Sequence, residues 1–503
     1  MNLTVLRRLA WIAGGAALLL GLLTLTRSPL VWRDEMPFAA ISYSLFNGGS
    51  GAPTILAEDS RFPITTFFYG PMFFWLGAVS FKVFGFSIFS FRLISWLGGF
   101  LLAAAAAALV RVLGGSRNWA AACWALVLLS PELGSTLTNG RMDTLAVAGI
   151  LGGLALFLRG LKEDSWVFPA LSGLVWAATV LTTPRTLQFF LCLALAAPFC
   201  WRGVAWRKFA ARFVVSGALT AAALGAWLWS QGETPLSWLR YLLYIGGFAR
   251  PYSVIGGFWR LRPTLLWVLT PLVCAMLLAV WRWRGGAWQT GRRDLLWVSL
   301  ALGGQSGLIF LTMARPESYP IFWGLPLLVV VLATLATQLP PAATRALCIA
   351  LVLAACANGG LRAVKMLNLA ASWAARDSQR LEDFARQNIP AGSRVIGPAE
   401  FYFYAVERAG STYRFHEPLR DAYFPFLENK LNPAFPAAQR QTFPAHFLWW
   451  PVGKPLPASC RCTEANRVAT YTPPVANSWL KRWRNNGGGY PPAGLYRIQP
   501  WVP

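Results

Sequence analysis

The sequence predicts an all-α, polytopic membrane protein, and three observations support that fold class. Of the 503 residues, 56% are hydrophobic and only 13% are charged, and the mean hydropathy is +0.46. Apolar runs recur along most of the chain, many of them close to the roughly 20 residues that a helix needs to cross a bilayer. Basic residues occupy the short loops between these runs, a distribution that orients membrane proteins. A soluble domain of this size does not carry so many long apolar runs.

The formal net charge of +25 narrows the classes of partner. A nucleic-acid-binding protein would collect its basic residues on a polar domain. Here many of them lie between apolar runs, where they suit anionic lipids and anionic ligands. The composition therefore argues against a nucleic-acid partner and for membrane lipids.

The first apolar run, residues 9–26, fixes the predicted orientation of the chain. Arg7 and Arg8 precede it, so the positive-inside rule places the N-terminus in the cytoplasm. No small-residue cleavage signature follows the run, and we expect a retained anchor rather than a removed signal peptide. The acidic pair Asp34-Glu35 then emerges on the outer side.

The apolar runs and basic loops together predict about eleven spans. After the first span they cover residues 88–110, 118–137, 143–158, 166–183, 187–201, 213–230, 264–281, 295–313, 320–338 and 345–361. Residues 27–87 form a long first outer loop, in which the aromatic segment 67–84 is expected to lie at the interface. If segment 67–84 crossed the membrane, the basic loops that follow would fall on different sides. The Gly149-x-x-x-Gly153 repeat is expected to be a close helix contact.

The chain changes character after residue 361, which divides it into a membrane domain, 1–361, and a C-terminal domain, 362–503. The second part is polar, Pro-rich and aromatic, and an odd number of spans places it outside. A helix ending at 381–388 and strands at 394–396, 468–471 and 495–498 predict a small α/β domain. Cys460 and Cys462 form a lone C-x-C there, with no second motif that would identify a disulfide or a metal site.

The acidic residues of the membrane domain avoid the middle of every predicted span. Proton and ion pathways usually display a buried ionisable group at that depth, so a proton-coupled transporter is disfavoured. Most of these acids fall at the predicted outer face, namely Asp34, Glu35, Glu58, Asp59, Glu132, Asp143, Glu233 and Glu317. The placement favours chemistry at the outer rim of the helices.

Arginine accompanies these acids in the predicted outer loops, where the positive-inside rule disfavours it. The set comprises Arg33, Arg61, Arg141, Arg185, Arg250, Arg260, Arg262 and Arg315. A single one of them is most simply a surface charge. As a group that faces the same side as the acids, they indicate a phosphate site, because guanidinium pairs with phosphate oxygens in a planar fork. Phosphate, carboxylates and aromatics at a membrane surface point to a lipid-linked phosphosugar.

These segments, taken in order, resemble the GT-C glycosyltransferases over roughly residues 1–340. The relatives include protein O-mannosyltransferases, the aminoarabinose transferase of lipid A and transferases of the lipopolysaccharide core. The matching segments are the Asp34-Glu35 pair, Tyr69-Gly70-Pro71, Phe91-Arg92-Leu93, Asn139-Gly140-Arg141-Met142-Asp143 and Arg315-Pro316-Glu317-Ser318-Tyr319. The resemblance implies spanning helices, interfacial helices in the first outer loop, and a cavity open to lipid.

The resemblance also implies roles for single residues. Asp34 would be the general base, Glu35 a substrate or metal contact, and Asp143 would lie across the same cavity. Donor phosphate and substrate would be held by Tyr69, Arg141, Arg185, Arg315 and Tyr319. Tyr69 stands where aminoarabinose transferases tend to have a lysine, so this chain is not expected to share their substrate. A divalent cation could bridge Asp34 or Asp143 to phosphate, although the sequence does not require one.

We therefore expect an integral-membrane enzyme that moves a sugar from a polyprenyl-phosphate donor to a lipid, glycan or protein acceptor. The family's range and the high arginine and alanine content suggest the inner membrane of a Gram-negative bacterium, with the acceptor on the periplasmic face. Two alternatives remain, a flippase or exporter of a lipid-linked sugar and a non-enzymatic assembly subunit. A flippase should show paired broken helices in two halves, which the sequence does not display.

Overall fold

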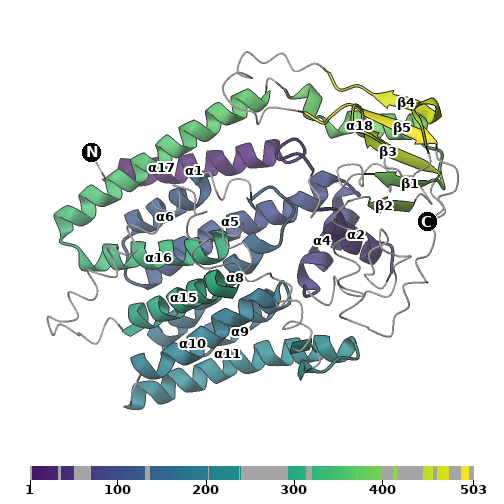
Figure 1. Ribbon diagram of the computed structural model, residues 1–503. Coiled ribbons are helices and arrows are strands. Elements are labelled where there is room, and N and C mark those ends of the chain that lie inside the picture. The colour runs from purple at the N-terminus through teal and green to yellow at the C-terminus, as the bar shows by residue number, and fades with distance from the viewer. Residues whose placement is uncertain are drawn as a thin grey trace.

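The computed structural model contains a bundle of helices and a small sheet at one end of it (Figure 1). The structure describes residues 3–31, 35–49, 69–130, 136–201, 203–236, 238–239, 293–312, 320–370, 372–397, 412–415, 446–456, 462–474 and 489–497. The predicted span 264–281 lies outside these residues, as do Asp34, Arg315 and Tyr319.

The helices of the bundle follow the predicted spans in order. They are α1 (Leu3–Leu23), α5 (Ile88–Val112), α6 (Arg117–Leu129), α8 (Asp143–Lys162), α9 (Val167–Val180), α10 (Leu187–Cys200), α11 (Gly203–Ser230), α15 (Arg293–Thr312), α16 (Pro320–Gln338) and α17 (Pro341–Ala370). Among the described residues, α1, α5, α8, α11, α16 and α17 are long and apolar enough to cross a membrane. The chain is therefore a multi-pass membrane protein, as predicted.

Several helix lengths differ from the prediction. Helix α6 ends at Leu129, eight residues before the expected end at 137, because Pro131 disfavours helical backbone in the residue before it. Helices α9 and α10 have 14 residues each, fewer than a perpendicular crossing needs. Helix α11 begins ten residues earlier than predicted, since its basic first turns continue the helix beyond the apolar run.

The first loop contributes two short helices, α2 (Glu35–Phe46) and α4 (Met72–Phe84). Helix α4 has 13 residues, too few to span a bilayer, which agrees with the prediction that this segment does not cross. Gly85 ends α4 with φ +81, a backbone conformation that glycine adopts without strain. The Ser87 side chain then caps α5 by accepting a hydrogen bond from Ser90 N.

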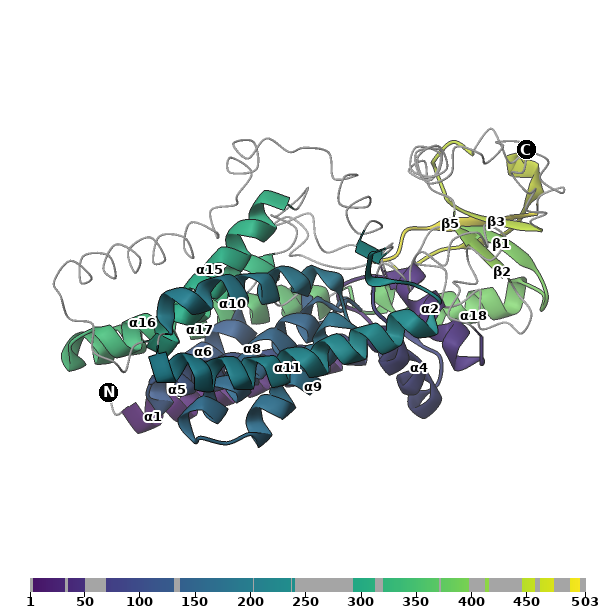
Figure 2. The same cartoon turned by 90° about the horizontal axis from the view of Figure 1, so that it is seen from below.

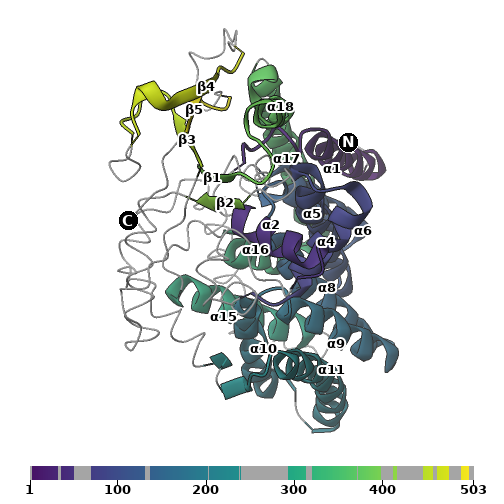
Figure 3. The same cartoon turned by 90° about the vertical axis from the view of Figure 1, so that its right-hand side faces the viewer.

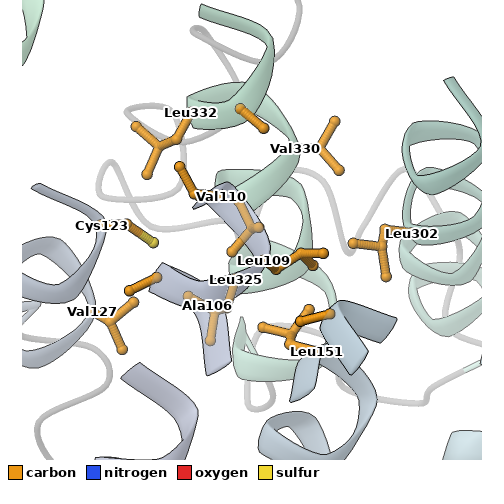
Figure 4. Close-up of a cluster of buried hydrophobic side chains, with 14 of the residues drawn as sticks. Ala106, Leu109, Val110, Cys123, Val127, Leu151, Leu302, Leu325, Val330 and Leu332 are labelled. Atoms are coloured by element: carbon orange, nitrogen blue, oxygen red, sulfur yellow. The ribbon is translucent and has the colours of Figure 1, made fainter. Parts of the chain in front are cut away.

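Close packing of small residues joins the central helices. A Cβ on Gly149 would lie 1.9 Å from Thr179 Oγ1, and one on Gly153 would lie 2.3 Å from Trp176 Nε1, so α8 and α9 touch at both glycines. This confirms the contact predicted for the Gly149-x-x-x-Gly153 repeat. The neighbouring apolar cluster combines side chains from α5, α6, α8, α15 and α16, among them Leu109, Val127, Leu151, Leu302 and Leu325 (Figure 4).

The C-terminal part contains helix α18 (Ser378–Asn388) and five strands. The strands are β1 (Arg394–Gly397), β2 (Thr412–Phe415), β3 (Phe447–Pro451), β4 (Arg467–Tyr471) and β5 (Ala493–Arg497), in the order β2-β1-β3-β5-β4. β1 is parallel to β2 and β3, whereas β5 is antiparallel to β3 and β4. The predicted α/β character and three of these strands are confirmed; β2 and β3 were not predicted. Cys462 is disulfide-bonded.

The sheet packs against the first loop. One buried cluster contains Phe38 of α2 and Phe73 of α4 together with Leu381 of α18 and Trp449 of β3. The views in Figures 1 and 2 both place the sheet at the end of the bundle away from the N-terminus of α1. Seen from that end, α2 and α4 lie over the bundle with the sheet to one side (Figure 3). This end, where the first loop and the C-terminal domain meet, is called the rim below.

Candidate active site

The first acidic motif is anchored at the rim by a buried ion pair. Glu35 begins α2, where a carboxylate suits the positive end of the helix dipole. Arg92 of α5 donates from Nε to Glu35 Oε1 at 2.6 Å and from Nη2 to Oε2 at 2.7 Å. Both side chains are fully buried. Such a two-point pairing fixes orientation as well as distance.

Arg92 also holds the chain that leads into this motif. Its Nη1 donates to Leu25 O and to Pro29 O, each at 2.7 Å. The guanidinium therefore ties the end of α1 and the start of α2 to one point on α5. No role was predicted for Arg92, whereas Glu35 was expected to contact substrate or metal. In the structure both carboxylate oxygens of Glu35 accept hydrogen bonds from Arg92, and the contact with substrate or metal stays a prediction. The position of Arg92 in the first turns of a predicted span was the available signal, since a buried charge there needs a partner.

The second acidic motif lies against the first. Gly140 has φ +63, and a Cβ at this position would be 2.9 Å from Glu35 Oε1 and 2.7 Å from the Phe91 ring. Ser95 Oγ of α5 donates to Arg141 O at 2.7 Å, and Thr144 Oγ1 donates to Ser95 O at 3.1 Å. Any side chain at position 140 would separate the two motifs. The structure thus brings Glu35 and Asp143, which are far apart in sequence, to the same rim.

Asp143 is the centre of a charged cluster. It begins α8 and is 2% exposed, and its Oδ2 accepts a hydrogen bond from Arg141 Nε at 2.6 Å. Arg185 Nη1, from the 3-10 turn η2 (Pro184–Thr186), lies 3.7 Å from Asp143 Oδ1. This Oδ1 is buried and accepts no hydrogen bond from the part of the chain that the structure describes. Arg185 remains 22% exposed, so the cluster has an accessible side.

Tyr69 completes the cluster from the chain just before α4. Arg185 Nη2 lies 3.4 Å from Tyr69 Oη, and its guanidinium carbon is 5.7 Å from the centre of the tyrosine ring. Met72 N donates to Leu181 O at 2.9 Å, so the start of α4 is bonded to the end of α9. A Cβ on Gly70 would lie 2.1 Å from Leu181 O, which explains the glycine between them. Tyr69, Arg141, Asp143 and Arg185 are therefore brought together, and their roles stay predictions.

The charges of this cluster suit an anion. Two guanidinium groups surround one carboxylate, so the described groups carry an excess of positive charge at the accessible side. Guanidinium offers paired donors to phosphate oxygens. The described residues include no group of three or more His, Cys, Asp or Glu side chains that could hold a metal ion. Asp34, the other ligand considered for a divalent cation, lies outside the described residues, so the cation stays a prediction from the sequence.

The opposite end of the bundle carries a different pattern of charge. An exposed pair joins Arg159 to Glu163 at 2.8 Å, and the exposed Lys162 lies 3.8 Å from the half-buried Asp294. Asp164 there accepts a hydrogen bond from Arg212, which lowers the pKa of its carboxyl. Neighbouring Lys208 contributes in the same direction at 3.5 Å. These charges lie in the loop after α8 and near the ends of α8, α11 and α15 that are away from the rim.

Comparison with known proteins supplies a sequence match in this region. A model of dolichyl-phosphate-mannose-protein mannosyltransferases matches residues 69–229. The matched segment includes Tyr69, Arg141, Asp143 and Arg185 but neither Glu35 nor the C-terminal domain. No curated protein shows significant sequence similarity to the chain.

Similar folds occur among solved structures. ArnT from Cupriavidus metallidurans in the apo state is 14% identical, with a TM-score of 0.52 over 88% of this chain and 92% of that chain. The same protein bound to undecaprenyl phosphate is 18% identical, with a TM-score of 0.48 over 75% of this chain and 66% of that chain. The oligosaccharyltransferase of Archaeoglobus fulgidus tethered to an acceptor peptide is 13% identical, with a TM-score of 0.42 over 88% and 68%.

Proposed function

The chain has the fold of the GT-C glycosyltransferases, and we propose that it moves a sugar from a polyprenyl-phosphate donor to an acceptor hydroxyl. One observation carries the proposal: Arg141 and Arg185 converge on buried Asp143 at the rim where Glu35 is anchored. A lipid-linked donor needs cations for its phosphate and a carboxylate for the acceptor, both at the membrane surface. The match to mannosyltransferases over residues 69–229 supports the same class of donor.

The reaction that we propose begins at Asp34. Its carboxylate takes the proton of the acceptor hydroxyl while the oxygen attacks C1 of the sugar. General-base assistance of this kind contributes roughly 10²–10⁴-fold to a rate. The ion pair with Arg92 fixes Glu35, the residue that follows Asp34 in the sequence.

The leaving group is the polyprenyl phosphate. As the bond between C1 and the phosphate oxygen breaks, negative charge develops on the phosphate, and Arg185 with Arg141 stabilises it. The phenol of Tyr69 donates a hydrogen bond to the same phosphate. Attack opposite the leaving group inverts the configuration at C1. Arg315 and Tyr319 are proposed to join this phosphate site from a later loop.

We place this chemistry on the periplasmic face of a bacterial inner membrane. The disulfide at Cys462 supports this orientation, because disulfides persist in oxidising compartments. The acceptor is a lipid, a glycan or a protein exposed there. Lipid A, other lipopolysaccharide and glycan acceptors are therefore the first candidates to test.

Asp34→Asn tests the base. Purified protein is incubated with radiolabelled polyprenyl-phosphate sugars and crude envelope acceptors, and we expect label transfer to fall by at least about 10²-fold. Glu163→Gln, a change in an exposed pair at the opposite end, should leave transfer unchanged. Wild-type turnover in Asp34→Asn would remove the base assignment, and movement of label across vesicles without transfer would favour a flippase.

A further inference from the structure

The connection between α17 and α18 is bonded to the segment that leads from α1 to Glu35. Arg27 Nη2 pairs with Asp377 Oδ2 at 3.0 Å, and Arg376 Nε donates to Arg27 O at 2.8 Å. The Arg27 guanidinium also lies over the Trp373 ring, 4.6 Å from its centre. Residues separated by about 350 positions in sequence therefore meet through a charge, a backbone acceptor and an aromatic face.

This connection is itself fixed to the C-terminal domain. Tyr490 N, next to β5, donates to Ala375 O at 3.0 Å, and a Cβ on Gly489 would lie 2.2 Å from the same oxygen. Asp377 also caps α18 by accepting from Gln379 N at 3.1 Å. Arg376 is 5% exposed, and burial lowers its pKa. Its guanidinium is therefore stabilised by protein acceptors such as Arg27 O rather than by water.

The same segment is held from its other side by the bundle. Arg92 binds Leu25 O and Pro29 O while it pairs with Glu35. Residues 25–29 thus lie between the Arg92 guanidinium of α5 and the Arg376 guanidinium of the α17–α18 connection. Because Arg92 binds both Pro29 O and the Glu35 carboxylate, we expect a displacement of residues 25–29 to alter the position of Glu35.

We propose that the α17–α18 connection positions the acidic motif, with Arg27, Arg376 and Asp377 as positioning residues that touch neither donor nor acceptor. The C-terminal domain would then set the geometry of the catalytic base from outside the membrane domain. The expected effect on sugar transfer rests on the proposed function. The coupling between the α17–α18 connection and the segment before Glu35 does not.

Two single variants and their combination test this coupling. Arg27→Gln removes the positive partner, and Asp377→Ser removes the negative partner while serine keeps the helix cap. We expect each to lower kcat roughly ten- to a hundredfold, since small misplacements of a reacting group cost that much. The donor KM should stay unchanged, and the double variant should be no slower than the slower single variant. An electrostatic effect on the base would instead shift the acidic limb of the pH profile in opposite directions in the two variants.

Hydrogen exchange of the amides in residues 24–31 and 35–49 gives a readout that does not depend on activity. Exchange should accelerate in both single variants, to the same extent in the double variant, and not in Arg386→Gln, which breaks an ion pair within α18. Unchanged exchange in the two segments, or additive effects of the two changes, would overturn the coupling. If wild-type protein transfers no sugar but the exchange pattern holds, the proposed function fails and the coupling stands.

Discussion

Single charged residues determine the contacts at the rim, and Arg92 is one that joins three segments of the chain. It satisfies Glu35 and two backbone oxygens from within the core. The sequence could predict that Glu35 lies at the outer end of the first span, because hydropathy and flanking arginines define that end. It could not predict that Arg92 would engage it. Pairing between residues 57 positions apart depends on how α5 packs, which no local pattern encodes.

Breaking that pair should be costly. Arg92→Gln leaves a buried carboxylate without its cation, so we expect the protein to lose about 3–5 kcal/mol of stability. The double variant Arg92→Gln/Glu35→Gln should be more stable than the single variant, since neither side then buries an uncompensated charge. Thermal unfolding in detergent measures both. Equal stability of the wild type and Arg92→Gln would show that the pair is not buried in the membrane-inserted protein.

Two tyrosines of the sheet offer a second contrast between residues. The buried Tyr471 hydroxyl has no hydrogen-bond partner among the described residues, whereas Tyr496 Oη donates to Glu464 Oε1 at 2.9 Å. A buried, unsatisfied polar group costs about 1–3 kcal/mol. Tyr471→Phe should therefore leave stability unchanged or raise it by about 1 kcal/mol, and Tyr496→Phe should lower it by a similar amount. Denaturation at pH 7 distinguishes the two, and a larger loss in Tyr471→Phe would contradict the geometry.

The loss of stability at alkaline pH provides a second test of Tyr471. Burial, followed by the nearby Tyr490, raises the pKa of Tyr471 above its usual value of about 10. The unfolded chain then ionises at lower pH than the folded domain, so stability is present below about pH 10 and is lost as pH rises through the folded pKa. Tyr471→Phe should lose less stability between about pH 9 and 11 than the wild type.

At the scale of helices, hydropathy predicted most elements and misplaced several ends. Helix α11 begins at Gly203, and its first turns contain Arg207 and Lys208. A hydropathy window excludes these residues, although arginine and lysine are good helix formers. Strand β3 was missed because it is a continuous apolar and aromatic run without alternation, and β2 was missed because it has only four residues. The α8–α9 contact was predicted correctly, since two glycines four residues apart mark one helix face.

Adjacent glycines of α8 give a matched test of that contact. In Gly153→Ala the new methyl group meets the buried Trp176 ring, whereas in Gly152→Ala it meets Ala105 Cβ at an ordinary 3.5 Å. We expect Gly153→Ala to lose about 1–3 kcal/mol through overpacking. Gly152→Ala should be neutral or gain up to about 1 kcal/mol from helix propensity. The changes in thermal stability of the two variants should therefore differ in sign or clearly in size. Equal losses would mean that α8 and α9 are not in contact at Gly153.

For the whole molecule, the sequence predicted that both acidic motifs share one end because an even number of crossings separates them. The packing of Gly140 on Glu35 agrees with that prediction. The docking of the C-terminal domain on the first loop could not be predicted, because it depends on contacts such as Arg27 with Asp377 that lie at opposite ends of the chain. The predicted roles of Asp34, Arg315 and Tyr319 remain predictions, since these residues lie outside the described part.

The orientation of the molecule can be tested by cysteine labelling. Gln231 follows α11 where Trp227 and Leu228 pack on Leu181 near the rim, and Lys454 lies in the exposed turn after β3. Lys162 and Lys208 are exposed at the opposite end. Cysteines at 231 and 454 should react with an impermeant maleimide in intact spheroplasts, and cysteines at 162 and 208 only after permeabilisation, because the apolar helices separate the two ends. Reaction of positions 231 and 454 from different sides would leave the rim without a shared compartment, and a transferase that uses Asp143 with Asp34 could not operate there.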